Sequence, residues 1–245
     1  MAGAGVFIGT AGWSLPREQQ HRFAGGGTHL ERYARVLPVA EINSTFHRPH
    51  RASTYARWAA SVPAPFRFSV KLPRTITHDR KLAGCGDLVD AFLAELAPLR
   101  PLVGCLLVQL PPKLELDART ARAFFGTLAA RFAGPIAVEP RHASWFTASA
   151  QRMLAALRVA RVAADPPRAE GGMDPGGWGG MAYYRLHGSP RVYYSSYGDA
   201  FLDTLAQRLQ SLARGGTPCW CIFDNTTLGA GTANALSLQE RLGVR

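Results

Sequence analysis

Short β-type runs alternate with amphipathic stretches along almost the whole chain, and this alternation limits the possible folds more than any other feature of the sequence. Eight runs of strand length are present, at residues 6–10, 39–44, 66–72, 103–110, 136–139, 161–164, 182–187 and 219–223. Stretches of helical periodicity lie at residues 28–37, 52–61, 87–99, 117–132, 148–157, 200–212 and 227–242. Alternating strands and helices predict a parallel sheet, and eight repeats favour its closure. The sequence therefore predicts an α/β fold, a single (β/α)8 barrel of the TIM type.

The length of the chain and one irregular connection refine this prediction. The chain has 245 residues, near the usual length of one such barrel, and no linker divides it, so residues 1–245 are expected to form one domain. The sixth connection, residues 165–181, reads PPRAEGGMDPGGWGG at its centre. Gly and Pro at this density do not suit a regular helix. We expect an irregular loop in place of the sixth helix.

The alternation of side chains along each strand predicts which residues point into the barrel. In the second strand the apolar Ile42 is best placed against the helices, so Glu41 and Asn43 point inward. The same parity applies to the other strands. It predicts a further set of polar inward residues near the strand ends: Ser69, Lys71, Gln109, Glu139, Asp165, Tyr183, Arg185, His187 and Asp224.

Charged residues in this set argue for a functional site. Burying a charge without a partner costs several kcal/mol, so a purely structural barrel would place apolar or small residues here. Barrel enzymes carry their chemistry at the C-terminal ends of the strands, where these residues converge. The alternative is a network of ions that satisfy one another and serve packing alone.

Seven segments resemble the signature segments of the domain of unknown function 72 family (YecE-like), in the expected order and over almost the entire chain. They are GTAGWS at residues 9–14, EINSTFHR at 41–48, FSVKLPRTITHDRKL at 68–82, QLPP at 109–112, VEPRHASWF at 138–146, YYRLHG at 183–188 and FDNT at 223–226. No single motif is diagnostic, but seven in register make a strong resemblance. The resemblance implies a (β/α) barrel and a set of site positions, and no particular reaction.

The residues favour an enzyme that uses acid/base and electrostatic catalysis on a small polar or anionic substrate at the mouth of the barrel. Glu41 and Glu139 are the acid/base candidates, since two carboxylates in unlike surroundings can divide those roles. Lys71, His187 and Asp224 complete the predicted catalytic set. The predicted substrate-binding residues are Trp13, Asn43, Gln109, Arg141, His142, Arg185, Tyr197 and Asn225.

Lys71 has a second interpretation. A lysine inside a barrel can form a Schiff base with a carbonyl substrate if its pKa is lowered. Several carboxylates nearby are expected to raise that pKa instead. An ion pair or an anchoring role for Lys71 is therefore preferred.

Two alternatives come from other classes of protein. The formal net charge of +11 favours an anionic partner, and nucleic acid is one candidate, although a GC-rich coding background would also raise the Arg count. No cofactor is predicted, but an oxygen-rich set could hold a divalent metal ion such as Mg or Mn in a hydrolase or isomerase. That set is Glu41, Glu139, Asp165, His187 and Asp224, with His142 as an added ligand or as a residue that orients Glu139.

The nucleic-acid alternative depends on aromatic side chains that lie near basic ones, because bases of a single strand stack on aromatic rings while cations bind its phosphates. The aromatic residues near predicted loops are Trp13, Phe46, Trp145, Phe146, Trp178, Tyr193, Tyr194 and Tyr197, and the basic residues there are Arg48, Arg51, Arg74, Arg80, Arg141 and Arg191.

The four cysteines and the apolar runs indicate the setting of the protein. The cysteines have neither the pairing of zinc sites nor the density of a disulfide scaffold. The first six residues are too few for a signal peptide, and no apolar run approaches the roughly 20 residues of a membrane span. We expect a cytoplasmic protein without membrane contact, and the sequence makes no prediction of its oligomeric state.

Overall fold

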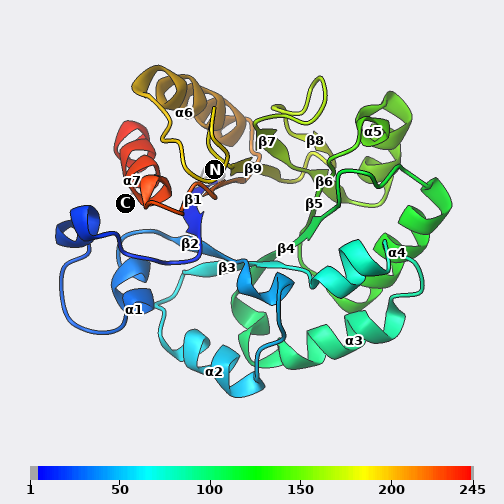
Figure 1. Cartoon of the computed structure of the whole chain (residues 1–245), viewed down its shortest axis with the longest axis horizontal. Helices are drawn as coiled ribbons and strands as arrows, with labels where there is room; N and C mark the ends of the chain where they lie inside the picture. The colour runs from blue at the N-terminus through cyan, green and yellow to red at the C-terminus, as the bar shows by residue number, and fades with distance from the viewer. Residues whose placement is uncertain (1–4, 244–245) are drawn as a thin grey trace.

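The structure is a computed structural model that describes residues 5–243. Its strands form one sheet that curls into a barrel, and α-helices surround it (Figure 1). The order around the sheet is β7-β9-β10-β1-β2-β3-β4-β5-β6-β8. The strands are β1 (Val6–Ala11), β2 (Val39–Ile42), β3 (Arg67–Lys71), β4 (Val103–Gln109), β5 (Ile136–Glu139), β6 (Val159–Arg161), β7 (Ala163–Asp165), β8 (Gly176–Gly177), β9 (Ala182–Leu186) and β10 (Cys219–Phe223).

The barrel closes through a strand that is broken in the middle. β6 pairs with β5, whereas β7, only one residue further along, pairs with β9, so the two halves of the sixth strand join the ends of the sheet. These pairings are parallel, as are those of β1 to β5, β9 and β10. β8 is antiparallel to β6 and belongs to the sixth connection. The predicted barrel is confirmed, but the prediction of one unbroken strand at residues 161–164 was wrong.

Seven α-helices are present within residues 5–243, and each corresponds to a predicted stretch. They are α1 (His29–Ala34), α2 (Ala52–Ala60), α3 (Gly86–Glu95), α4 (Ala118–Arg131), α5 (Ala148–Ala156), α6 (Asp199–Arg214) and α7 (Ala230–Leu242). Several begin at a side chain that satisfies the free N–H groups of the first turn. Asp117 accepts from the N–H groups of Arg119 and Thr120 at the start of α4, and Thr147 does so for α5.

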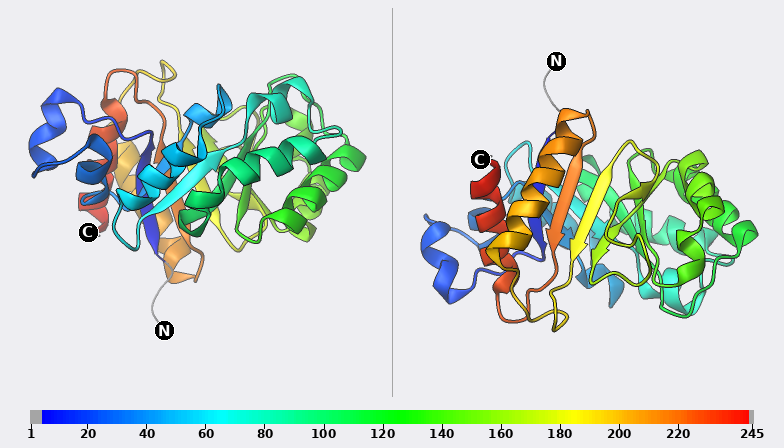
Figure 2. Two further views of the ribbon diagram at one scale, coloured as in Figure 1. Left: turned by 90° about the horizontal axis from the view of Figure 1, so that it is seen from below. Right: turned by 90° about the horizontal axis from the view of Figure 1, so that it is seen from above.

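The sixth connection, between β7 and β9, contains turns and β8 and has no α-helix, as the Gly and Pro content predicts. The outer surface of β1 and β10 is covered by α6 and α7 (Figure 2). No helix within residues 5–243 has the length and apolar character needed to cross a membrane.

The core has two layers, which test the predicted inward and outward faces. Inside the barrel lie apolar residues such as Cys105, Leu107 and Ile222, and the larger outer layer lies between the sheet and the helices. This alternation confirms the predicted parity for most polar residues. Asp165 is the exception. Because Ala164 packs inside the barrel, the side chain of the next residue points outward.

Candidate functional site

A fully buried arginine lies at the centre of the polar end of the barrel. The guanidinium of Arg185, on β9, contacts three carboxylates. It donates from Nη2 and Nε to Glu41 at 2.7 and 2.9 Å and from Nη1 to Glu139 at 3.0 Å. Its Nη2 also lies 3.1 Å from an oxygen of Asp224. The side chains of Arg185 and Glu41 have no exposed surface.

His187 joins two of these carboxylates from the other side. Its Nδ1 lies 2.9 Å from Asp224 Oδ2, and its Nε2 lies 2.9 Å from Glu139 Oε1. Burial alone would lower the pKa of His187, but Glu139 and the two hydrogen bonds outweigh burial and raise it. An imidazolium that donates from both nitrogens fits this geometry.

The charges in this cluster are close to balance. Arg141 Nη2 lies 3.4 Å from Glu139 Oε1, so three cations, counting the imidazolium, face three carboxylates. Burial acts to raise the pKa of Glu139, but the charges of His187 and Arg185 hold it well below its ordinary value. The same two neighbours lower the pKa of Asp224 against the effect of burial. The self-satisfied ion network considered above is therefore present.

The network forms the floor of a cavity at the C-terminal ends of the strands. This mouth cavity has a volume of about 490 Å³. Three basic residues line it, Lys71, Arg74 and Arg141, against one carboxylate, Asp224, and Arg74 also pairs with Asp79 at 3.2 Å. The complete lining is Asn43, Phe46, His47, Lys71, Arg74, His78, Gln109, Arg141, Tyr193, Asp224, Thr226 and Thr227.

Lys71 is the buried amine of this cavity. It ends β3, is only 5% exposed, and holds its Nζ 4.1 Å from the centroid of the Phe46 ring. Among the residues that the structure describes, no side chain forms an ion pair or hydrogen bond with this Nζ. Burial, and then the charge of Arg185, lower its pKa to about 8. The expectation that this pKa would rise was wrong, because burial and the charge of Arg185 outweigh the opposing effect of Glu41, Glu139 and Asp224.

Short turns after β2 and β3 bring the loop residues to the cavity. A 3₁₀ turn at Ser44–Phe46 follows β2, and the hydroxyl of Thr45 donates to the carbonyl of Lys71 at 2.6 Å, which ties the two strand ends together. A π-helical turn at Thr75–Asp79 follows β3 and carries His78. Burial, together with nearby cations including Lys71, lowers the pKa of His78.

Strand parity cannot find residues in such turns. It missed His47, His78, Thr226 and Thr227 altogether, and Phe46, Arg74 and Tyr193 entered only as part of the nucleic-acid hypothesis. The signal that could have found most of them is their place in the family-like segments at residues 41–48, 68–82 and 223–226.

Three of the predicted substrate-binding residues line the cavity. Gln109 donates from Nε2 to Glu139 Oε2 at 2.9 Å, so one side of its amide is fixed. The Oδ1 of Asn43 is buried and accepts no hydrogen bond from the described residues, and the buried Nε of Arg141 donates none to them. Arg185, the fourth predicted binding residue at this end, lies beneath the cavity within the network.

Two of the predicted catalytic residues also lie beneath the cavity. Glu41 has both oxygens on Arg185 and accepts from the Tyr183 hydroxyl at 3.0 Å, while Glu139 is 1% exposed. Together with His187 they are brought into one cluster, yet none of the three is part of the cavity lining.

Trp13 and His142, both predicted to bind substrate, lie elsewhere. Trp13 packs edge-on against Trp58 and Phe68 in the outer layer. The ring of His142 accepts from the N–H of Ser144 and begins the 3₁₀ turn Ala143–Phe146, so it neither joins nor orients Glu139.

Tyr197 and Asn225, also predicted to bind substrate, form hydrogen bonds within the protein framework instead. The Tyr197 hydroxyl donates to Asp165 Oδ1 at 3.1 Å and accepts from the Gly188 N–H at 2.8 Å. Asn225 donates to Asn234 Oδ1 and to the carbonyl of Ser195. These bonds hold the loop after β9 against α7 and lie outside the lining of the cavity.

The carboxylates of the network do not fit a divalent cation. Arg185 occupies the space among Glu41, Glu139 and Asp224 that a shared metal ion would need. Within residues 5–243, no group of three or more His, Cys, Asp or Glu is arranged to hold a metal ion.

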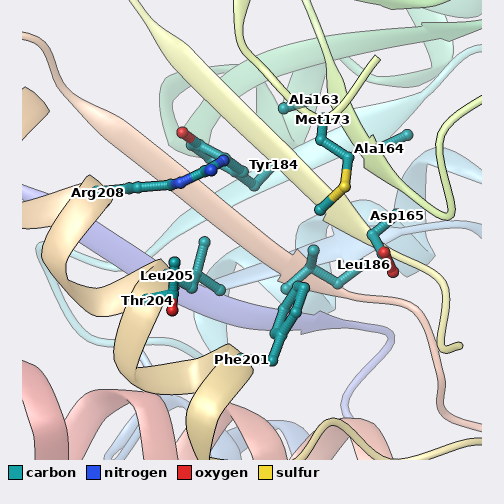
Figure 3. Close-up of a pocket in the computed structure, with 10 residues that line it drawn as sticks. All are labelled: Ala163, Ala164, Asp165, Met173, Tyr184, Leu186, Phe201, Thr204, Leu205 and Arg208. Atoms are coloured by element: carbon teal, nitrogen blue, oxygen red, sulfur yellow. The ribbon is translucent and has the colours of Figure 1, made fainter. Parts of the chain in front are cut away.

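A second, smaller cavity lies outside the barrel, between β7, β9 and α6 (Figure 3). Its volume is about 140 Å³ and its lining is mostly apolar, with Met173 from the sixth connection facing Phe201 and Leu205 of α6. Asp165 lies at its edge, where burial raises its pKa. It is separate from the mouth cavity.

The fold and the site define a TIM-type barrel protein with a charged cavity at the C-terminal ends of its strands. Residues 7–245 match the family described as "Protein of unknown function DUF72", and the chain belongs to this family. The UPF0759 protein YecE of Escherichia coli K12 is 37% identical over 106 residues, which are 43% of this chain and 38% of that protein. The UPF0759 protein YunF of Bacillus subtilis 168 is 24% identical over 58% of this chain and 52% of that protein. The chain thus matches about half or less of the length of these curated relatives.

Solved structures of two DUF72 family proteins share the fold. One from Enterococcus faecalis superimposes with a TM-score of 0.80 at 21% identity and covers 100% of both chains. One from Thermotoga maritima gives a TM-score of 0.78 at 22% identity, covering 97% of this chain and 99% of that one.

Proposed function

We propose that this barrel is an enzyme that binds a small anionic substrate in the mouth cavity and acts on it by acid/base and electrostatic catalysis. The observation that carries the proposal is the imbalance of charge in the lining. Lys71, Arg74 and Arg141 line the cavity against one carboxylate, Asp224, which already bonds Arg185 and His187. Arg74 pairs with Asp79 and Arg141 with Glu139, two carboxylates outside the lining, whereas Lys71 has no such partner among the described residues. A ligand with a carboxylate or phosphate group would restore the balance.

The lining suggests which groups bind and which react. Arg141, whose Nε has no partner among the described residues, and Arg74 at the rim would hold the acidic group of the substrate. Asn43 Oδ1 would accept from a hydroxyl or amine on the substrate. Lys71 and Asp224 are the reacting groups, because they reach the cavity and can exchange protons with a bound molecule.

The buried residues beneath would act by holding the others in place. Glu41 and Glu139 fix Arg185, and His187 fixes Asp224 through Nδ1. A network that is already oriented before the substrate binds needs no reorganisation when charge develops during the reaction. Glu41, Glu139 and His187 are therefore positioning residues in this proposal.

Binding of small anions tests the proposal. Isothermal titration of the full chain with pyruvate and with inorganic phosphate should give saturable binding of at least one of them. Arg141→Gln should weaken that binding by about tenfold, the loss of one charge-assisted contact of about 1.4 kcal/mol. Arg214→Gln is the matched control, because this substitution removes the same charge at an exposed position at the end of α6. It should leave the affinity unchanged.

Two results would overturn the proposal. One is the absence of binding of either anion. The other is binding of a single-stranded RNA oligonucleotide with an affinity that falls steeply with salt, alongside small anions that fail to compete with it. Such a salt dependence reports many phosphate contacts and would favour the nucleic-acid alternative.

A further inference from the structure

We infer that Lys71 is a nucleophile that condenses with the carbonyl carbon of the substrate. The substrate would then be a carbonyl compound that carries an acidic group, such as a 2-oxo acid. The inference rests on the proposed function, because the acidic group is what the cations of the mouth cavity would bind. It adds the reacting atom and the kind of bond formed.

The position of the amine carries this inference. Lys71 ends β3 inside the barrel, lines the cavity, and has a side chain that is almost wholly buried. The Phe46 ring flanks the Nζ on one side, and no described residue accepts a hydrogen bond from it. An amine held in this way has a lone pair or a proton available to a ligand and to nothing else within hydrogen-bonding reach.

The residue type supports the same conclusion. Only three of the 28 Lys and Arg residues in the chain are lysines. Lys81 and Lys113 are exposed, so Lys71 is the one buried amine in this arginine-rich protein. A guanidinium would bind an anion in this cavity at least as well, but it cannot lose its proton and attack a carbonyl. A lysine here is what nucleophilic chemistry requires.

The electrostatic setting makes the amine usable. A pKa of about 8 leaves roughly a tenth of Lys71 neutral at pH 7, far more than an exposed lysine would provide. The cationic imine that forms later would lie beside the face of Phe46, which stabilises positive charge.

The reaction balances without an oxidant or reductant. The lone pair of Nζ forms a bond to the carbonyl carbon, and the C=O π electrons move to oxygen. A proton passes from nitrogen to that oxygen to give a carbinolamine, and Asp224, in the lining of the same cavity, is placed to carry it. Protonation of the hydroxyl and loss of one water leave a protonated C=N bond.

Reductive trapping tests this inference. The full chain is incubated with pyruvate and sodium borohydride, digested, and analysed by peptide mass spectrometry. We expect the reduced adduct on Lys71 and not on Lys81 or Lys113, which serve as internal controls in the same sample. Lys71→Arg should give no adduct, and the double variant Lys81→Arg/Lys113→Arg should give the full amount. Hydroxyacetone, a ketone without the carboxylate, should label Lys71 at least tenfold less.

The outcomes separate this inference from the function on which it rests. If pyruvate binds in the titration above but no adduct forms on Lys71, or if the three lysines are labelled equally, Lys71 is not the nucleophile and the anion-binding site stands. If neither anion binds and no adduct forms, both proposals are overturned.

Discussion

Arg185 and Glu41 form a bidentate ion pair that is sealed from solvent, with Nη2 2.7 Å from Oε1 and Nε 2.9 Å from Oε2. Removing one partner of such a pair leaves an uncompensated buried charge, which costs about 3–5 kcal/mol. Here the loss of Arg185 would expose three carboxylates to one another. We expect Arg185→Met to lower the free energy of unfolding by at least this amount in urea denaturation.

The control for this variant is an exposed pair. Arg131→Met removes the pair with Asp90, whose side chains are 36% and 54% exposed. It should cost far less than the loss of Arg185, because exposed ion pairs contribute little to stability. Arg185→Lys should not restore stability, because an ammonium cannot contact three carboxylates as a planar fork does. Equal stability of Arg185→Met and the wild type would contradict the role given to the network.

His187 should make stability depend on pH in a defined direction. Glu139 and Asp224 raise the pKa of its imidazole against the effect of burial. The folded protein therefore holds the proton more tightly than the unfolded chain does. This stabilisation is fully present below the ordinary pKa of 6.5 and is lost as pH rises through the raised value.

The measurement compares the wild type with His187→Gln. The difference in unfolding free energy should be largest near about pH 5.5 and shrink as pH rises above neutrality. Glu139 and Asp224 have lowered pKa values, so their stabilisation is already complete above 4.5 and 3.8 and stays constant in this range. A difference that grew with pH would mean that the folded imidazole is neutral.

Much of the barrel and its floor follows from the sequence because strands have a strict period. Alternation along each strand places Glu41, Lys71 and Arg185 inside, and the structure agrees. Parity also shows why Asp165 was misplaced, since it follows Ala164, an inward residue. The break between β6 and β7 has no such pattern in the sequence. It arises because β6 pairs with β5 whereas β7 pairs with β9, and these pairings depend on the neighbouring strands.

The interactions between inward residues are harder to predict from sequence. Parity gives the members of the network but not their pairing, and the pairing decides the state of Lys71. Burial, with repulsion from Arg185, outweighs the attraction of the three carboxylates, so the amine loses affinity for its proton. The turns that bring Phe46 and His78 to the cavity have no periodicity to detect.

A buried amine with a lowered pKa should destabilise the folded protein near neutral pH. A decrease from 10.5 to about 8 corresponds to roughly 3 kcal/mol at about 1.36 kcal/mol per pH unit. We expect Lys71→Met to raise the free energy of unfolding at pH 7 by up to this amount. Because the folded pKa is lowered, the cost is present below about 8 and disappears above 10.5.

Chemical denaturation at several pH values checks this expectation. The gain from Lys71→Met should diminish as pH is raised from 8 toward 10.5, whereas Lys81→Met, at an exposed position, should give no gain at any pH. A loss of stability at pH 7 on replacing Lys71 would show that its ammonium is stabilised by the carboxylates after all.

Tyr197 and Tyr193 provide a test of which tyrosine belongs to the framework and which to the cavity. Tyr197→Phe removes a buried hydroxyl that bonds Asp165 and the Gly188 N–H, and it should cost about 1–3 kcal/mol of stability. Anion affinity should stay unchanged, because Tyr197 is not part of the lining.

Tyr193 lines the cavity and is 40% exposed, so Tyr193→Phe should leave stability nearly unchanged. The two effects are measured by urea denaturation and by titration with the anion that binds the wild type. If Tyr197→Phe weakened anion binding without loss of stability, the boundary drawn here between framework and cavity would be wrong.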